Sequence, residues 1–160
     1  MKHRLLALDL DGTLLGPDHH VRDGMPEALF AAQAAGMAVC LATGRSYIET
    51  VEIWRELDLR RPFLPLVLVG GAMACRPDTG QTVYQRPIPR AVACEFDVAL
   101  AEAGYPSMAL VDASQYEWDY LLTEAGDADR THRDWFAKMD VRVHRVPRLS
   151  DSPDLPLPLR

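Results

Sequence analysis

Blocks of apolar residues separated by polar turns run through the first half of the chain. Three short apolar runs, at residues 5–8, 37–42 and 66–69, lack strict alternation of apolar and polar residues. The first ends at two carboxylates, and all three are followed by turn residues. This pattern is typical of strands buried in a parallel sheet. The segments between the runs have apolar residues at helical spacing. The order therefore predicts alternating strands and helices.

The expected helix ends have recognisable residues. Asp23 is a plausible N-cap for the first helix, and Gly36 suits the position just after its last turn. Ser46 and Glu49 have capping-box spacing ahead of a second helix at 47–57. A strand, a helix and a strand at this spacing form a right-handed βαβ unit. Such a unit would bring the carboxyl ends of the first two strands to one edge of the sheet.

The second half of the chain has a different character. A hairpin at 72–75 and 82–86 leads to Pro87 and Pro89, which mark a linker. Helix–strand–strand–helix–strand order with antiparallel pairing then predicts an α+β unit. Its expected elements are a helix at 90–103, strands at 108–111 and 118–122, a helix at 131–139 and a strand at 141–143. The predicted organisation is a core at 1–87, an α+β unit at 88–149, and a proline-rich tail at 150–160 that is extended or disordered.

Composition narrows the class of protein. Apolar residues make up 48% of the 160 residues and charged residues 25%, as in a globular protein. The net charge is −6 without a basic block, which argues against a nucleic-acid partner. No apolar stretch reaches the roughly 20 residues that a membrane helix needs. Three cysteines without metal or redox spacing suggest reduced thiols, and hence a cytoplasmic protein.

The candidate chemistry lies where the first two strands end. Asp9 and Asp11 close the first apolar run, followed by Gly12, and Thr43 follows the second run. On an extended strand the two carboxylates leave the same side, about 7 Å apart. Ligands of open parallel sheets bind beyond the carboxyl ends of the strands. Two acids there indicate a metal or phosphoryl-transfer site, because two unpaired charges inside a buried strand would be too costly.

Two motifs resemble one family. Residues 9–13 read D-x-D-G-T and residues 42–45 read A-T-G-R. They resemble the first two motifs of the haloacid dehalogenase (HAD) superfamily, in its Cof-type subgroup of sugar- and small-phosphate phosphatases. The resemblance implies an α/β fold: a Rossmann-like core of βαβ units, here partial, with an α+β cap that chooses the substrate.

The resemblance also implies roles for individual residues. Asp9 would be the nucleophile that forms an aspartyl-phosphate, and Asp11 the general acid and base. Both would hold Mg²⁺, Asp11 through its backbone carbonyl. The phosphoryl group of a small phosphorylated metabolite would be held by the N–H groups of Leu10 and Asp11 and by Thr43, Gly44 and Arg45.

The chain also departs from the family pattern. Gly70 stands where an asparagine is usual, and the later lysine motif and acidic motif are missing. An alternative expectation is therefore a truncated, catalytically impaired fragment, with exposed apolar surface or self-association through an incomplete core. An unrelated nucleotide-binding βαβ domain is disfavoured, because the chain has no G-x-G-x-x-G motif or P-loop.

Overall fold

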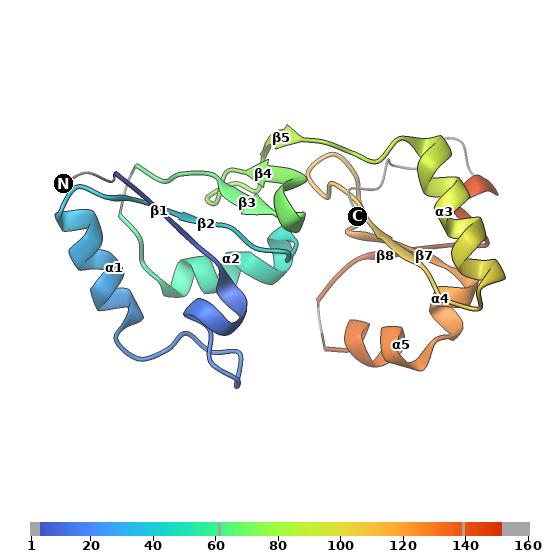
Figure 1. The fold of residues 1–160 in the computed structure, drawn as a ribbon, viewed down its shortest axis with the longest axis horizontal. Helices are drawn as coiled ribbons and strands as arrows, with labels where there is room; N and C mark the ends of the chain where they lie inside the picture. The colour runs from blue at the N-terminus through green and yellow to red at the C-terminus, as the bar shows by residue number, and fades with distance from the viewer. Residues whose placement is uncertain (1–3, 61, 139, 152–160) are drawn as a thin grey trace. The chain divides into compact units, whose positions relative to one another are not determined.

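The computed structural model describes residues 4–60, 62–138 and 140–151 (Figure 1). The chain divides into two compact units, with the boundary between Gln85 and Arg86. Unit 1 carries the helices and strands of the predicted core. Its elements are β1 (Leu5–Leu8), a helical turn η1 (Leu10–Leu14), α1 (Met25–Ala34), β2 (Ala38–Leu41), α2 (Tyr47–Glu56), β3 (Leu66–Leu68), a 3₁₀ turn η2 (Val69–Gly71), β4 (Met73–Cys75) and β5 (Thr82–Gln85).

The predicted βαβ unit is present. Strands β1 and β2 pair in parallel, with Leu8 opposite Leu41, and they run side by side in Figure 1. Strand β3 continues the parallel arrangement through one bridge, between Ala42 and Val67. The carboxyl ends of these three strands consequently lie along one edge, where polar residues can converge on a ligand.

Strand β1 is less buried than its sequence predicts. Leu5 is 57% exposed, and along the strand exposed residues alternate with half-buried ones. The prediction of a strand buried on both faces is wrong here, because β1 pairs on one side with β2 and only one of its faces packs inward. The alternation shows a half-buried strand.

Helix boundaries agree with the sequence in part. The N-cap of α1 is Gly24, with φ of 79°, and it makes no side-chain capping bond, so the prediction of Asp23 as N-cap is wrong. Gly36 follows the last turn with φ of 85°, as predicted. The carboxylate of Glu49 accepts a 2.9 Å bond from the N–H of Ser46, which confirms the capping box of α2.

The predicted hairpin is also present. Strands β4 and β5 pair antiparallel, and β3 pairs antiparallel with β4, so β3 joins the parallel core to the hairpin. Between β3 and β4 the chain turns at Val69 and Gly70, which have φ of 55° and 61°. A β-branched residue at positive φ is strained, and it persists only where its surroundings hold it.

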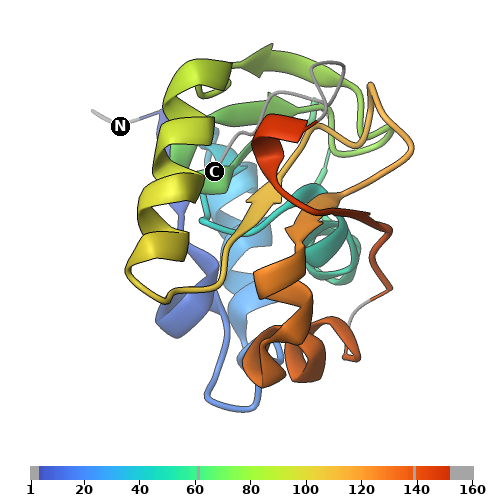
Figure 2. The same ribbon diagram turned by 90° about the vertical axis from the view of Figure 1, so that its right-hand side faces the viewer.

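Unit 2 is a sheet of three strands with helices on it (Figure 2). Helix α3 packs on the sheet through a small apolar core that includes Ala93, Ala109, Leu121 and Val146. The elements are α3 (Arg90–Glu102), β6 (Met108–Leu110), β7 (Tyr120–Thr123), α4 (Glu124–Ala128), α5 (Arg130–Phe136), β8 (Val143–Val146) and a 3₁₀ turn η3 (Leu149–Asp151).

Several predictions for unit 2 need correction. Strand β7 pairs antiparallel with β6 but parallel with β8, so the expectation of antiparallel pairing is only half right. Strand β8 starts two residues later than predicted, because Val143–Val146 is the stretch that reaches β7. Helix α4 was not predicted, and the predicted helix at 131–139 runs from Arg130 to Phe136. The prediction of an extended or disordered tail from residue 150 is wrong at its start, because Ser150 and Asp151 belong to the 3₁₀ turn η3. Residues 152–160 lie outside the described part, as does Met139.

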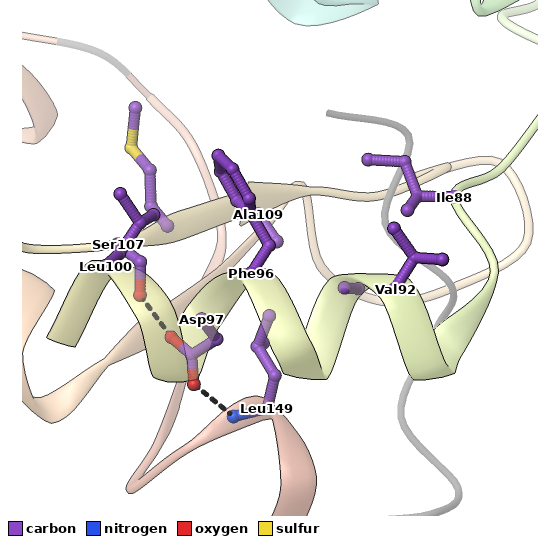
Figure 3. Close-up of a pocket in the computed structure, with 10 residues that line it drawn as sticks. Ile88, Val92, Phe96, Asp97, Leu100, Ser107, Ala109 and Leu149 are labelled. Atoms are coloured by element: carbon purple, nitrogen blue, oxygen red, sulfur yellow. Dashed lines mark hydrogen bonds between the residues drawn. The ribbon is translucent and has the colours of Figure 1, made fainter. Parts of the chain in front are cut away.

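A buried carboxylate joins three segments of unit 2 (Figure 3). Asp97 of α3 accepts a 2.5 Å bond from the hydroxyl of Ser107 and a 3.3 Å bond from the N–H of Leu149. Beside it lies an apolar groove of about 370 Å³, where Val92 and Phe96 are exposed. Self-association of the chain through this exposed apolar surface stays a prediction.

In the part of the chain that the structure describes, no helix has both the length and the apolar character to cross a membrane.

Candidate active site

The end of β1 places two carboxylates in a wide turn. Asp9 is extended, and its Oδ1 accepts a 2.8 Å bond from the N–H of Leu10. The turn closes with a 2.9 Å bond from the N–H of Leu15 to the carbonyl of Leu10, five residues apart. Gly12 has φ of 74°, which residues with a side chain rarely adopt. The fully buried side chains of Leu10 and Leu15 anchor the turn in the core, while Asp9 and Asp11 stay exposed.

The end of β2 places a buried hydroxyl beside this turn. Thr43 is 5% exposed, and its N–H donates to the carbonyl of Val67 at 2.9 Å. Its Oγ1 accepts a 3.3 Å bond from the N–H of Arg45. The strained turn after β3 supports the same segment, because the N–H groups of Val69 and Gly70 donate to the carbonyls of Arg45 and Thr43.

Arg45 joins the two strand ends. Its Nη2 and Nε lie 2.6 Å and 2.9 Å from the two carboxylate oxygens of Asp11, a bidentate ion pair. The hydrogen bond from Arg45 holds the pKa of Asp11 below its usual range, against the opposing effect of partial burial. The same bond raises the pKa of Arg45, and the charge of Asp9 adds to that effect. Asp9, Asp11 and Arg45 therefore form one electrostatic cluster.

The structure thus brings together most of the predicted site residues. Asp9, Asp11, Thr43 and Arg45 meet at the ends of β1 and β2, and Gly44 is exposed between the last two. The N–H of Leu10 already donates to Asp9, so it can serve a phosphoryl group only by leaving that bond.

Two contributions to the site were not predicted. The backbone turn at Val69 and Gly70 carries the Thr43–Arg45 segment, and Arg22 donates to carbonyls of the Asp11 turn. The repeated glycine at 70 and 71 was a visible hint of unusual backbone. Nothing in the local sequence around Arg22 points to its contacts.

The donor set fits a magnesium ion that keeps several waters. Among the described residues, no group of three or more His, Cys, Asp or Glu side chains is placed to hold a metal. The Asp9 carboxylate and the Asp11 carbonyl offer two hard oxygen donors. Magnesium is commonly bound by one or two carboxylates, substrate phosphate and water, so two donors are compatible with it.

We expect Arg45→Met to raise the pKa of Asp11 towards its ordinary value, because the largest cause of the lowered pKa is removed. The measurement is an NMR titration of the Asp11 carboxyl group. Arg55→Met is the matched control, since Arg55 lies on α2 and pairs with Glu52 instead. An unchanged Asp11 titration in Arg45→Met would contradict the ion pair.

The same pair has a consequence for stability. A carboxyl group whose pKa is lowered by folding stabilises the fold above the pKa of the unfolded chain. That contribution is lost as the pH falls through the folded pKa. The effect is small here, because the Asp11 side chain is 53% exposed and solvent screens the pair.

Comparison with known families supports membership of a hydrolase family. The family model of haloacid dehalogenase-like hydrolases matches residues 6–138. That range contains Asp9, Asp11, Thr43 and Arg45.

Similar proteins include several that are named as phosphatases. The chain is 30% identical over 85 residues to a putative phosphatase of Streptococcus pyogenes serotype M6, covering 53% of this chain and 32% of the relative. It is 33% identical over 93 residues to the HMP-PP phosphatase of Serratia proteamaculans, covering 58% and 32%. The matched segments therefore span about a third of the length of these relatives.

A solved structure gives the fold over nearly the whole chain. The HAD subclass IIB sugar phosphatase BT4131 superposes with a TM-score of 0.70 at 21% identity, over 96% of this chain and 56% of that one. At this identity the likeness establishes the fold, a Rossmann-like α/β arrangement, and says nothing of the substrate.

Proposed function

Because this chain belongs to the haloacid dehalogenase-like hydrolase family, we propose that it hydrolyses phosphate monoesters of small metabolites with the help of Mg²⁺. One observation carries the proposal. The parallel pair β1–β2 brings Asp9 and Asp11 to the same sheet edge as Thr43 and Arg45. Phosphoryl transfer requires groups that carry out the chemistry, here two carboxylates. It also requires groups that bind the phosphate, here the guanidinium of Arg45 and the hydroxyl of Thr43.

In the proposed first step, a carboxylate oxygen of Asp9 attacks phosphorus and the bond from phosphorus to the ester oxygen breaks. Asp11 gives its proton to the leaving alcohol. Water then attacks the aspartyl-phosphate, Asp11 takes a proton from it, and the bond between Asp9 and phosphorus breaks to release inorganic phosphate. When bound by Asp9 and the Asp11 carbonyl, Mg²⁺ would neutralise charge on the phosphoryl oxygens.

The ion pair between Arg45 and Asp11 bears on this proposal. A carboxylate held by two hydrogen bonds from an arginine is a poor proton donor. We expect the phosphate dianion of the substrate to draw Arg45 away from Asp11, since arginine binds phosphate and carboxylate with the same planar fork. Thr43 would add a neutral hydrogen bond to the phosphoryl group. Unit 2 would then be the part that selects among substrates, as the resemblance implies.

A second candidate function is binding of phosphate esters without turnover. It is favoured by the donor set, because the described residues hold no third acidic metal ligand near Asp9 and Asp11. Unit 1 also has no lysine among its described residues. The charge of Asp11 is balanced mainly by the bidentate pair with Arg45, with a smaller contribution from His19.

A single experiment separates these candidates. The full chain is mixed with a chromogenic phosphate monoester, with Mg²⁺ or with a chelator, and phosphate release is measured. We expect release that requires Mg²⁺. In parallel, NMR shifts of the Thr43 and Arg45 amides are followed on addition of inorganic phosphate. Shifts without any release would favour binding alone, and neither response would reject both candidates.

A further inference from the structure

The loop after the Asp11 turn folds back against it. Leu15 and Val21 form an antiparallel bridge, and the N–H of Gly16 donates to the carbonyl of His20 at 2.9 Å. The N–H of Arg22 then donates to the carbonyl of Leu14 at 3.0 Å. The loop at residues 16–21 therefore leaves the turn and returns to it before α1 begins.

The side chain of Arg22 reaches further into the turn. Its Nε donates to the carbonyl of Leu15 at 3.2 Å, and its Nη2 donates to the carbonyl of Gly12 at 3.4 Å. One guanidinium therefore bridges the residue that follows Asp11 and the residue that closes the turn. Both contacts are to backbone, so they restrain the path of the chain.

This turn has reason to need such support. Its own closing bonds run over five residues, from Leu14 to Asp9 at 3.4 Å and from Leu15 to Leu10 at 2.9 Å. Asp11 and Gly12 have non-helical backbone angles inside it. Because Gly12 does not have helical backbone angles, its carbonyl lies outside a regular helix, and the 3.4 Å bond from Arg22 supplies it with a charged donor.

We propose that Arg22 is a positioning residue that holds the Asp11 turn in place for catalysis. It acts through the carbonyls of Gly12 and Leu15 and does not contact the substrate. The catalytic part of this inference rests on the proposed function, whereas its hold on the turn does not. The planar fork is essential, because a lysine ammonium at the end of a flexible stem is not shaped to bridge two carbonyls at once.

Two substitutions and one control test the hold on the turn. Arg22→Met removes both side-chain bonds. Arg22→Lys keeps the charge but has a single donor nitrogen in place of the two that Arg22 uses. Arg55→Met removes an exposed arginine of α2 that pairs with Glu52. We expect amide hydrogen exchange of Leu15, measured by NMR, to rise roughly tenfold in Arg22→Met. The rise should be smaller in Arg22→Lys and absent in Arg55→Met. Unchanged exchange in Arg22→Met overturns the inference, whether or not the chain has phosphatase activity.

Kinetics of the same variants test the catalytic consequence. We expect kcat for the chromogenic ester to fall by about tenfold in Arg22→Met with KM nearly unchanged, because a displaced Asp11 affects the reacting geometry. Arg22→Lys should recover part of the loss. Faster exchange with unchanged kcat would make Arg22 a structural clamp only and overturn its catalytic role. No turnover by the parent chain would instead reject the proposed function, with the exchange result still deciding whether Arg22 holds the turn.

Discussion

Asp9→Asn is expected to abolish turnover of phosphate monoesters, with a fall in kcat of more than about 10³-fold, as for loss of a covalent nucleophile. The amide cannot form the acyl-phosphate bond. The substitution should leave the fold intact, because the side-chain oxygen of asparagine can still accept the N–H of Leu10 as Asp9 does. The loss of activity would then report chemistry and not unfolding.

The measurement is steady-state phosphate release by both chains, with thermal unfolding to show that they are equally stable. Asp23→Asn is the matched control, since Asp23 is an exposed carboxylate of the same unit before α1. Turnover retained in Asp9→Asn would exclude Asp9 as the nucleophile. Equal losses in both variants would point to a general charge effect.

The second large effect is expected from Asp11→Asn, and it should depend on the leaving group. For an alkyl phosphate, kcat should fall about 10²- to 10⁴-fold, because the poor leaving group needs a proton. For a nitrophenyl phosphate, the first step needs little help from an acid. The second step still needs a base, so nitrophenolate should appear in a burst of about one equivalent of the chain and then slow.

Rapid-mixing absorbance measurements on nitrophenyl phosphate, beside steady-state assays on an alkyl phosphate, check this result. Asp11→Asn also removes one charge from the bidentate pair with Arg45. Arg45→Met also breaks the pair and leaves the Asp11 carboxyl in place, but it removes a proposed phosphate ligand as well. It should therefore lower activity on both esters alike and give no burst. In Asp11→Asn, equal losses for both esters without a burst would be inconsistent with Asp11 as acid and base.

The fold illustrates which features can be predicted locally. The runs at β1, β2 and β3 were found because a short apolar segment ending at a turn is a property of neighbouring residues. The capping box of α2 and Gly36 after α1 are local for the same reason. Asp23 failed as an N-cap although its residue type is favourable, because the chain enters α1 through Gly24 at positive φ.

Unit 2 shows where local reasoning stops. The parallel direction of β8 against β7 and the helix α4 between them depend on which surfaces the intervening chain can cover. Alternating residues at 141–143 fit a strand equally well in either direction, since the period of two is the same for both. The side-chain pattern therefore predicted that a strand exists near residue 143, but it did not predict the bounds of β8 or its parallel pairing with β7.

The sequence by itself determined which residues could do chemistry here: two acids after one strand, and a threonine and an arginine after the next. Their types and spacings are local, and each of the two apolar runs forms a strand that ends just before them. Only the tertiary structure decided how they are joined. Arg45 pairs with Asp11 across 34 residues, and Arg22 braces the turn at Gly12 across ten. Such partners are selected by the packing of separate segments, where many exposed arginines could compete for the same oxygen and geometry alone chooses one.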